Sequence, residues 1–311
     1  MKKAVKKAIP GAAKVYEKQP MQEINRDKEE HGKKPFDGLK KLEEKIVSES
    51  KTDLESGVFH KGEHKKCFAY AAQTACDKNG YIIDVTVNPG NVHDSVALDG
   101  LYDRLITKSP EIKAAVMDAG YKTSWICKKF FDDDRIPVLT YKRPMGKDGF
   151  FRPYEYIFDE YYDCVLCPEN QVLNYSTTNR DGYKEFRNKP YICRNCHSLS
   201  RCTNSAKREK LVTKHIWSDY LERAENIRHT PEYRELYEKR KETIERVFTD
   251  AKEKHGMRYT NFRGLAQVTK WVRLKFAAMN LKKYAIHKWI RDGKDRLLLL
   301  VFRFFPEISF C

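Results

Sequence analysis

Four cysteines are spaced like the ligands of a metal ion. Five of the nine cysteines in this 311-residue chain lie within a stretch of 39 residues. Cys164 and Cys167 are separated by two residues, as are Cys193 and Cys196, and 25 residues lie between the two pairs. Two such pairs supply four thiolates for tetrahedral Zn²⁺. In a long chain without a secretory signal, metal binding is favoured over disulfide bonds. We therefore predict a zinc site here.

Other residues near the two pairs leave the ligand set open. Cys202 and His197 are alternatives for one of the four ligands. The predicted role of the zinc is structural, because the surrounding segment is expected to be too small to build a core of its own. Three further cysteines, Cys67, Cys76 and Cys127, are predicted to be small buried apolar residues.

Two carboxylates are placed where they could take part in metal-dependent chemistry. Asp118 directly follows the apolar run 112–117, a predicted strand, and α/β sheets bind ligands at the carboxyl ends of their strands. Glu245 lies on a predicted helix, and Lys252 follows on the same face about two turns later. Two carboxylates can bind Mg²⁺, and a nearby lysine can contact a phosphate. This combination suits phosphoryl transfer on DNA by two metal ions. The alternatives are that Asp118 only caps a turn and that Glu245 only borders the core.

The pair His93-Asp94 is a weaker candidate for acid–base or metal chemistry. It follows the turn at Pro89-Gly90 and precedes a predicted helix. In that position a His-Asp pair is more often a helix cap, which is the interpretation that we favour.

The positive charge of the chain is concentrated in its last 60 residues. The chain has 60 Lys and Arg against 44 Asp and Glu, a formal charge of +16, and residues 252–311 contain 14 basic and 4 acidic side chains. With the interleaved aromatics Trp271 and Trp289, this segment is a candidate polyanion-binding surface; a solvated helix face is the alternative. The one long uncharged apolar run, residues 297–302, is too short to span a membrane. We expect a cytoplasmic protein with no membrane partner.

The elements that must position these residues alternate between strands and helices. Residues 67–75 and 81–87 are predicted to form a β-hairpin, because Asn79-Gly80 provides positive φ at little cost. The order of elements predicts the α/β class with a mixed sheet. The next predicted elements are a helix over 95–106, a strand over 112–117, a helix capped by Thr123 or Ser124, and a strand over 135–141.

A cysteine-rich segment and two helices complete the chain. Residues 141–210 show no long periodicity and are predicted to be an insertion. A helix is predicted to begin at Thr230-Pro231 and to end near Gly256. Pro favours the first position of a helix, and Gly favours the position just after its end. A second helix, over about 265–289, has one apolar face and is otherwise strongly basic.

Three stretches of sequence resemble one enzyme family. They are GNVHDS at 90–95, VMDAGYKT at 116–123 and IERVFTDAKEKHGMRYTNFRGL at 244–265. In this order they resemble the catalytic region of DDE transposases from bacterial insertion sequences, in the branch that has a cysteine-bearing insertion before the last glutamate. The resemblance covers about residues 57–290.

The resemblance implies an RNase H-like fold and metal-dependent DNA cleavage and strand transfer. In that family three carboxylates bind two divalent metal ions, Mg²⁺ or Mn²⁺; Asp118 would be the second carboxylate and Glu245 the third. Lys252 matches the basic residue of the family's motif, whereas Tyr237 and Arg240 are one place away from the usual spacing. The implied partners are transposon-end and target DNA, and the chain would act as a homo-oligomer in a transposition complex. The residues predicted to bind DNA are Lys252, Arg246, Arg258 and Arg263.

The first carboxylate of the family has no counterpart in this sequence. It would follow the first, central strand of the sheet, upstream of the hairpin, and residues 1–65 contain no strand-like run of that form. Asp27, Asp37 and Asp53 all lie in charged sequence that does not resemble a strand. We therefore expect an N-terminally truncated catalytic domain that is inactive by itself. The alternatives are a non-catalytic nucleic-acid-binding module and an inactive transposase remnant.

This interpretation divides the chain into five predicted parts. They are a basic linker or arm (1–56), the first part of the catalytic domain (57–140), the Cys-rich insertion (141–210), the second part of the catalytic domain (211–290) and a tail (291–311).

Overall fold

The predicted β-hairpin is present and forms the centre of a sheet. In the computed structural model, β4 (Lys65–Cys76) and β5 (Ile82–Pro89) pair antiparallel, with Tyr70 opposite Pro89 and Ala75 opposite Asp84. The turn between them is made by Gly80, whose φ of 75° favours glycine, and by the Asp77 carboxylate, which accepts the N–H groups of Asn79 and Tyr81.

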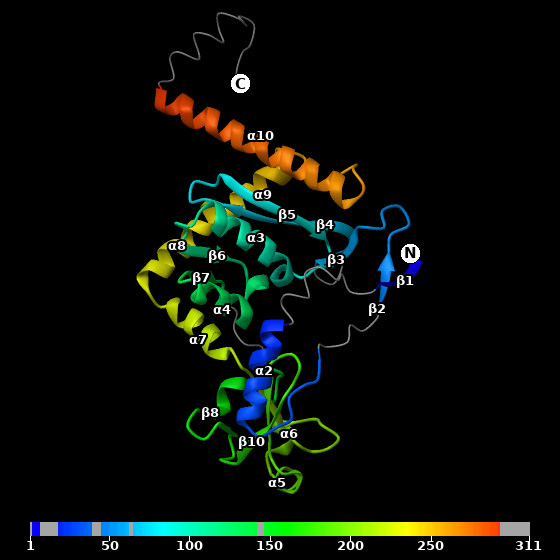
Figure 1. The fold of residues 1–311 in the computed structure, drawn as a ribbon, viewed down its shortest axis with the longest axis vertical. Coiled ribbons are helices and arrows are strands. Elements are labelled where there is room, and N and C mark those ends of the chain that lie inside the picture. The colour runs from blue at the N-terminus through cyan, green and yellow to red at the C-terminus, as the bar shows by residue number, and fades with distance from the viewer. Residues whose placement is uncertain (1, 7–17, 39–44, 62–64, 142–145, 293–311) are drawn as a thin grey trace, which may run out of the picture. The chain divides into compact units, whose positions relative to one another are not determined.

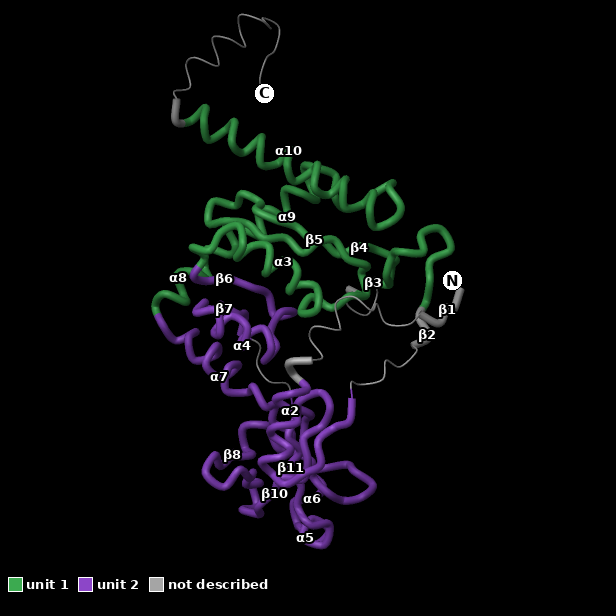
Figure 2. The backbone as a smooth tube through the Cα atoms, in the orientation of Figure 1, with its two compact units in different colours: residues 1–4, 48–112, 231–311 green, residues 5–47, 113–230 purple. Residues whose placement is uncertain are grey.

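The structure describes residues 2–6, 18–38, 45–61, 65–141 and 146–292. The apolar run 297–302 of the predicted tail lies outside these residues. The chain divides into two compact units, coloured separately in Figure 2. Unit 1 comprises residues 1–4, 48–112 and 231–311, and unit 2 comprises residues 5–47 and 113–230. The strands β1 (Lys2–Lys6) and β2 (Lys45–Glu49) form a small sheet of their own.

In unit 1 a third strand extends the hairpin. β3 (Gly57–Lys61) pairs with the first residues of β4, and β5 pairs with the rest. β3 and β5 meet at Gly57 and Gly90, because a Cβ added to Gly57 would lie 2.7 Å from the Gly90 nitrogen. Strands on opposite edges of β4 would be about 9–10 Å apart, so β3 and β5 follow one another along the same edge. No strand in the described residues pairs with the other edge of β4.

Helices cover both faces of this sheet (Figure 1). These helices are α3 (Asp94–Lys108) on one face and α9 (Ile244–Glu253) and α10 (Leu265–Asp292) on the other. Side chains along β5 point alternately to the two faces. Val85 and Val87 are buried with α9 and α10, whereas Asp84 and Thr86 accept hydrogen bonds from Arg104 of α3. The remaining buried members of this core are Ile82, Val247, Ala251, Val268, Val272 and Phe276.

The single helix predicted after Thr230 is broken. It forms α8 (Pro231–Glu242) and α9, and Thr243 between them has φ −105° and ψ −93°, which are not helical values. The Thr243 hydroxyl donates back to the Lys239 carbonyl at 2.9 Å. Glu245 therefore lies in the first turn of a helix, and not in the middle of a longer one.

In unit 2 the strand–helix–strand order is as predicted. β6 (Ala114–Met117) pairs parallel with β7 (Ile136–Leu139), and α4 (Ser124–Asp132) connects them with Thr123 as its N-cap. The Thr123 hydroxyl accepts the N–H of Ile126, which confirms one of the two predicted caps. Phe130 of α4 is buried, as are Ile126, Cys127 and Val138.

The cysteine-rich insertion has a sheet and a core of its own, contrary to the prediction. Five antiparallel strands follow the order β12-β11-β10-β9-β8. Val165, Leu173 and Phe186 are almost fully buried between them. The sequence did not reveal this sheet because most of its strands are short: β8 and β9 have only three residues each. The five strands are β8 (Ile157–Asp159), β9 (Cys164–Leu166), β10 (Val172–Thr178), β11 (Tyr183–Arg187) and β12 (Leu211–His215).

Part of the predicted N-terminal linker is a helix that packs against this insertion. α2 (Lys18–Glu30) buries Ile24, and its Asp27 carboxylate accepts the Thr178 hydroxyl and pairs with Lys184 at 3.0 Å. Lys184 also pairs with Asp163 at 3.3 Å. Asp27 thus has a structural role. α7 (Ser218–Ile227) packs against α4, with the rings of Trp125 and Trp217 5.4 Å apart.

The structure confirms mixed α/β architecture but not a single continuous sheet. Within the described ranges, β3–β5 and β6–β7 form separate sheets, so the strand order of an RNase H-like fold remains a prediction. No helix in the part of the chain that the structure describes has the length and apolar character needed to cross a membrane.

Candidate functional site

Asp118 follows directly after β6, as predicted. It is exposed, and its Oδ1 accepts the N–H of Ala119 at 2.7 Å at the start of a short 3₁₀ helix, Ala119–Tyr121. The alternative role of Asp118 as a turn cap is therefore confirmed.

A small cavity near this strand end contains cations that the sequence analysis missed. Its lining includes Lys122, Tyr141 and Arg228. The Arg228 guanidinium lies 3.8 Å from the centre of the Tyr141 ring, and Lys122 forms an ion pair with Glu225. No periodicity linked Arg228 to Asp118, because the two are 110 positions apart in the sequence.

Glu245 is half exposed in the first turn of α9. Its Oε1 lies 3.7 Å from Nη1 of Arg240, a residue of α8. A carboxylate at this end of a helix also benefits from the positive end of the helix dipole. Arg240 is a site residue that sequence reasoning left without a role, since the break at Thr243 is what brings it next to Glu245.

The four residues predicted to bind DNA are all exposed in unit 1. Lys252 and Arg246 lie on α9, and Arg258 and Arg263 lie in the connection from α9 to α10. Arg258 pairs with the Glu253 carboxylate, whereas the other three form no ion pair with any residue that the structure describes. Three of the four cations are thus available for a phosphate.

His93 and Asp94 belong to the fold and not to this site. The Nδ1 of His93 accepts the N–H of Ser95 as the N-cap of α3, and Asp94 accepts a hydrogen bond from Gln73 at 2.8 Å. The predicted helix-capping role is confirmed.

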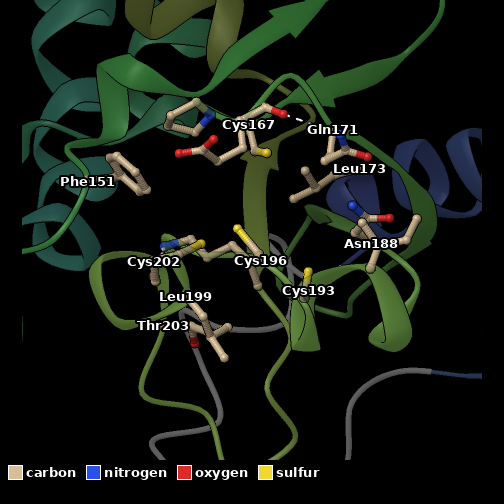
Figure 3. A pocket seen from close by; sticks show the side chains of 14 residues that line it. Phe151, Cys167, Gln171, Leu173, Asn188, Cys193, Cys196, Leu199, Cys202 and Thr203 are labelled. Carbon is tan, nitrogen blue, oxygen red and sulfur yellow. Dashed lines mark hydrogen bonds between the residues drawn. The ribbon is translucent and has the colours of Figure 1, made fainter.

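Three of the four predicted zinc ligands line one cavity in unit 2. Cys167, Cys193 and Cys196 are joined there by Cys202, and their sulfur atoms are directed toward the same space (Figure 3). Cys164 is buried in β9 and is not part of the lining. In the described part of the chain, no three His, Cys, Asp or Glu side chains are arranged to hold a metal ion as they stand.

The other cysteines and His197 lie elsewhere. His197 is exposed and pairs with Glu169 at 3.2 Å. Cys127 is fully buried, and burial raises the pKa of its thiol to about 12, which agrees with the predicted apolar role. For Cys67 that prediction is wrong, because the residue is exposed on β4.

Residues 166–285 match the transposase DDE domain family. The match begins at the end of β9 and reaches into α10, so it includes the cysteines of the cavity, Arg240, Glu245 and all four predicted DNA-binding cations. Asp118 lies outside the matched residues. Comparisons with curated proteins and with solved structures gave no match.

The match to a transposase DDE domain draws on both units. Residues 166–230 belong to unit 2 and residues 231–285 to unit 1. Asp118 is in unit 2 and Glu245 is in unit 1.

Proposed function

We propose that this chain carries out DNA transposition as a transposase catalytic domain. The observation that carries the proposal is the match of residues 166–285 to the transposase DDE domain family, which contains the exposed, arginine-paired Glu245. The reaction would be metal-dependent cleavage and strand transfer at transposon ends. The partners would be transposon-end and target DNA, bound by a homo-oligomer of the chain.

Asp118 and Glu245 would hold divalent metal, Mg²⁺ or Mn²⁺. Carboxylate oxygens are the ligands that these hard cations prefer, and both side chains are exposed to solvent. When bound, the metal would activate the attacking oxygen and stabilise the leaving one. Arg240 would orient the Glu245 carboxylate through their ion pair.

Cations on α9 and beyond it would hold the DNA backbone. Lys252, Arg246 and Arg263 are exposed without carboxylate partners in the described residues, and each could neutralise a phosphate. Binding would then weaken as the salt concentration rises, because the release of counterions from DNA favours the complex less at high salt.

The third carboxylate of such a site would come from a strand that pairs with the open edge of β4. No described strand pairs with that edge. A strand that ends in Asp-Thr or Asp-Ser would complete a sheet of the RNase H-like type there.

The test is cleavage of DNA that carries the transposon ends, with Mg²⁺, by a chain extended with the residues encoded upstream of Met1. We expect cleavage by the extended chain, and its loss on Asp118→Asn or Glu245→Gln. Glu242→Gln, an exposed carboxylate on α8, is the matched control and should leave cleavage unchanged. Equal cleavage by all variants would show that the assignment of these carboxylates is wrong.

The second candidate function is a nucleic-acid-binding module without catalysis. The exposed cations of α9 favour it, since they would bind phosphate with or without metal. It predicts salt-sensitive DNA binding by the 311-residue chain that needs no Mg²⁺ and tolerates both carboxylate substitutions.

A further inference from the structure

We propose that Cys167, Cys193, Cys196 and Cys202 bind one metal centre through four thiolates, and that Cys164 is not a ligand. Zn²⁺ and iron–sulfur clusters both take four cysteine thiolates, so the ligand chemistry is shared and the occupant is decided by experiment. This site lies wholly within unit 2 and does not depend on the proposed transposition activity.

The four thiols come from three short segments that the fold brings together. Cys167 opens the turn after β9, where its N–H donates to the Gln171 carbonyl at 3.0 Å and its carbonyl accepts from Asn170. Cys193 lies in α5 (Pro190–Arg194), and the Cys196 N–H donates to the Cys193 carbonyl at 3.2 Å. Cys202 ends α6 (Leu199–Cys202). Figure 3 shows all four around one space.

The strand geometry explains why Cys164 is excluded. In a strand, adjacent side chains point to opposite faces. Val165 is buried with Leu173 and Phe186, and Cys167 packs against that core, so Cys164 lies on the other face of β9. Cys164 pairs with Asp159 of β8 and Asn174 of β10, and only 7% of it is exposed.

His197 is excluded by its position. Its side chain is 82% exposed, its Nε2 pairs with the Glu169 carboxylate at 3.2 Å, and it does not line the cavity. Cys202 is therefore the fourth ligand, and the motif becomes Cys167, Cys193, Cys196 and Cys202.

The surroundings of the four thiols suit a metal centre. The cavity between them has mainly apolar walls. The Tyr156 hydroxyl lies 3.3 Å from the Cys202 sulfur, and Lys210 donates to the Cys202 carbonyl at 3.2 Å. The hydrogen bond orients one ligand, and the ammonium offsets part of the negative charge of four thiolates. The apolar lining includes Phe151, Leu173, Ile192 and Leu199.

Metal binding would tighten this part of the unit. No three of the thiols stand at ligand spacing in the described structure, so a bound centre must draw them into the cavity. The segments that carry them are turns and helices of five and four residues, with little burial of their own. Binding energy would therefore stabilise the fold of residues 188–210 directly.

The test is metal analysis of the 311-residue chain, purified without oxygen from cells supplied with zinc and iron. We expect one centre per chain, which Cys202→Ser loses and the controls Cys164→Ser and Cys67→Ser keep. Zinc without sulfide identifies a single ion, and iron with acid-labile sulfide identifies a cluster; either result supports the site. A metal-free wild-type chain would overturn the proposal, as would loss of metal in Cys164→Ser with retention in Cys202→Ser.

A measurement on the wild-type chain covers the case in which Cys202→Ser does not fold. X-ray absorption at the edge of the bound metal counts its ligands. A coordination shell of sulfur alone, without an imidazole nitrogen, is expected for either occupant, and a mixed shell with nitrogen would overturn the ligand set. Removal of the metal by a chelator should lower the melting temperature of the wild-type chain.

Discussion

The guanidinium of Arg240 and the carboxylate of Glu245 lie 3.7 Å apart across the break between α8 and α9. The side chain of Arg240 is only 18% exposed, whereas that of Glu245 is 50% exposed. The cation is thus fixed in the fold, and the carboxylate faces solvent. In the proposed function, Arg240 would position Glu245 for a ligand and would not bind the ligand itself.

Loss of Arg240 should impair the reaction attributed to Glu245 without unfolding unit 1. In the extended chain, we expect Arg240→Ala to lower DNA cleavage by about 10- to 100-fold, a typical effect of removing a group that orients a metal ligand. Arg240→Lys should restore part of the activity, because it keeps the charge. Raised Mg²⁺ should rescue Arg240→Ala if positioning is the cause, and failure of both rescues would argue for a structural role only.

The Asp53 carboxylate should stabilise unit 1 through Tyr70. It accepts the Tyr70 hydroxyl at 2.9 Å and the Gly264 N–H at 3.2 Å, which joins β4 to the start of α10. Burial raises the pKa of Tyr70, and Asp53 raises it further. We expect Tyr70→Phe to lower the free energy of unfolding by about 1–3 kcal/mol, because Asp53 loses a partner. Tyr259→Phe, at an exposed position, is the control for the denaturant titration.

Acid should weaken the contact between β5 and α3. Burial alone would raise the pKa of Asp84, but the hydrogen bond and charge of Arg104, with the charge of Lys108, bring the net pKa below its ordinary value of 3.8. A carboxyl with a lowered pKa in the folded state adds stability above pH about 4 that is lost as the pH falls further. Arg104→Met should cost about 1 kcal/mol at pH 7, since Arg104 is partly exposed. The difference from wild type should shrink in unfolding curves at pH 3.

His215 should make unit 2 sensitive to mild acid. Its ring packs beside Gly182, and its Nδ1 accepts the Trp217 N–H at 3.0 Å. Burial lowers its pKa below the ordinary value of 6.5. The unfolded chain therefore takes up the proton first, and stability should fall as the pH drops below about 6.5.

The His215 effect can be separated from other titrations by substitution. His215→Asn keeps an acceptor for the Trp217 N–H and should flatten the fall in melting temperature between pH 7 and pH 5. His60→Asn replaces an exposed histidine and should leave the wild-type slope unchanged. Equal slopes in all three proteins would contradict the prediction.

The sequence by itself determined the elements whose signals are local. The Asn79-Gly80 turn, the Thr123 cap, the His93 cap and the long basic helix α10 all agree with the structure. Each depends on the conformational preference of one or two residues or on one apolar periodicity, which neighbours in the chain suffice to set. The placement of Asp118 after a strand was predictable for the same reason.

Only the tertiary structure decided which distant residues meet. It brought short strands together into the sheet of the insertion and docked α2 onto that sheet through Asp27. It also broke the helix at Thr243, so that Arg240 reaches Glu245. It also placed Cys202, and not Cys164, beside Cys167. These outcomes depend on pairing and burial between segments far apart in the chain, and spacing along the sequence carries no information about which face of a strand is covered.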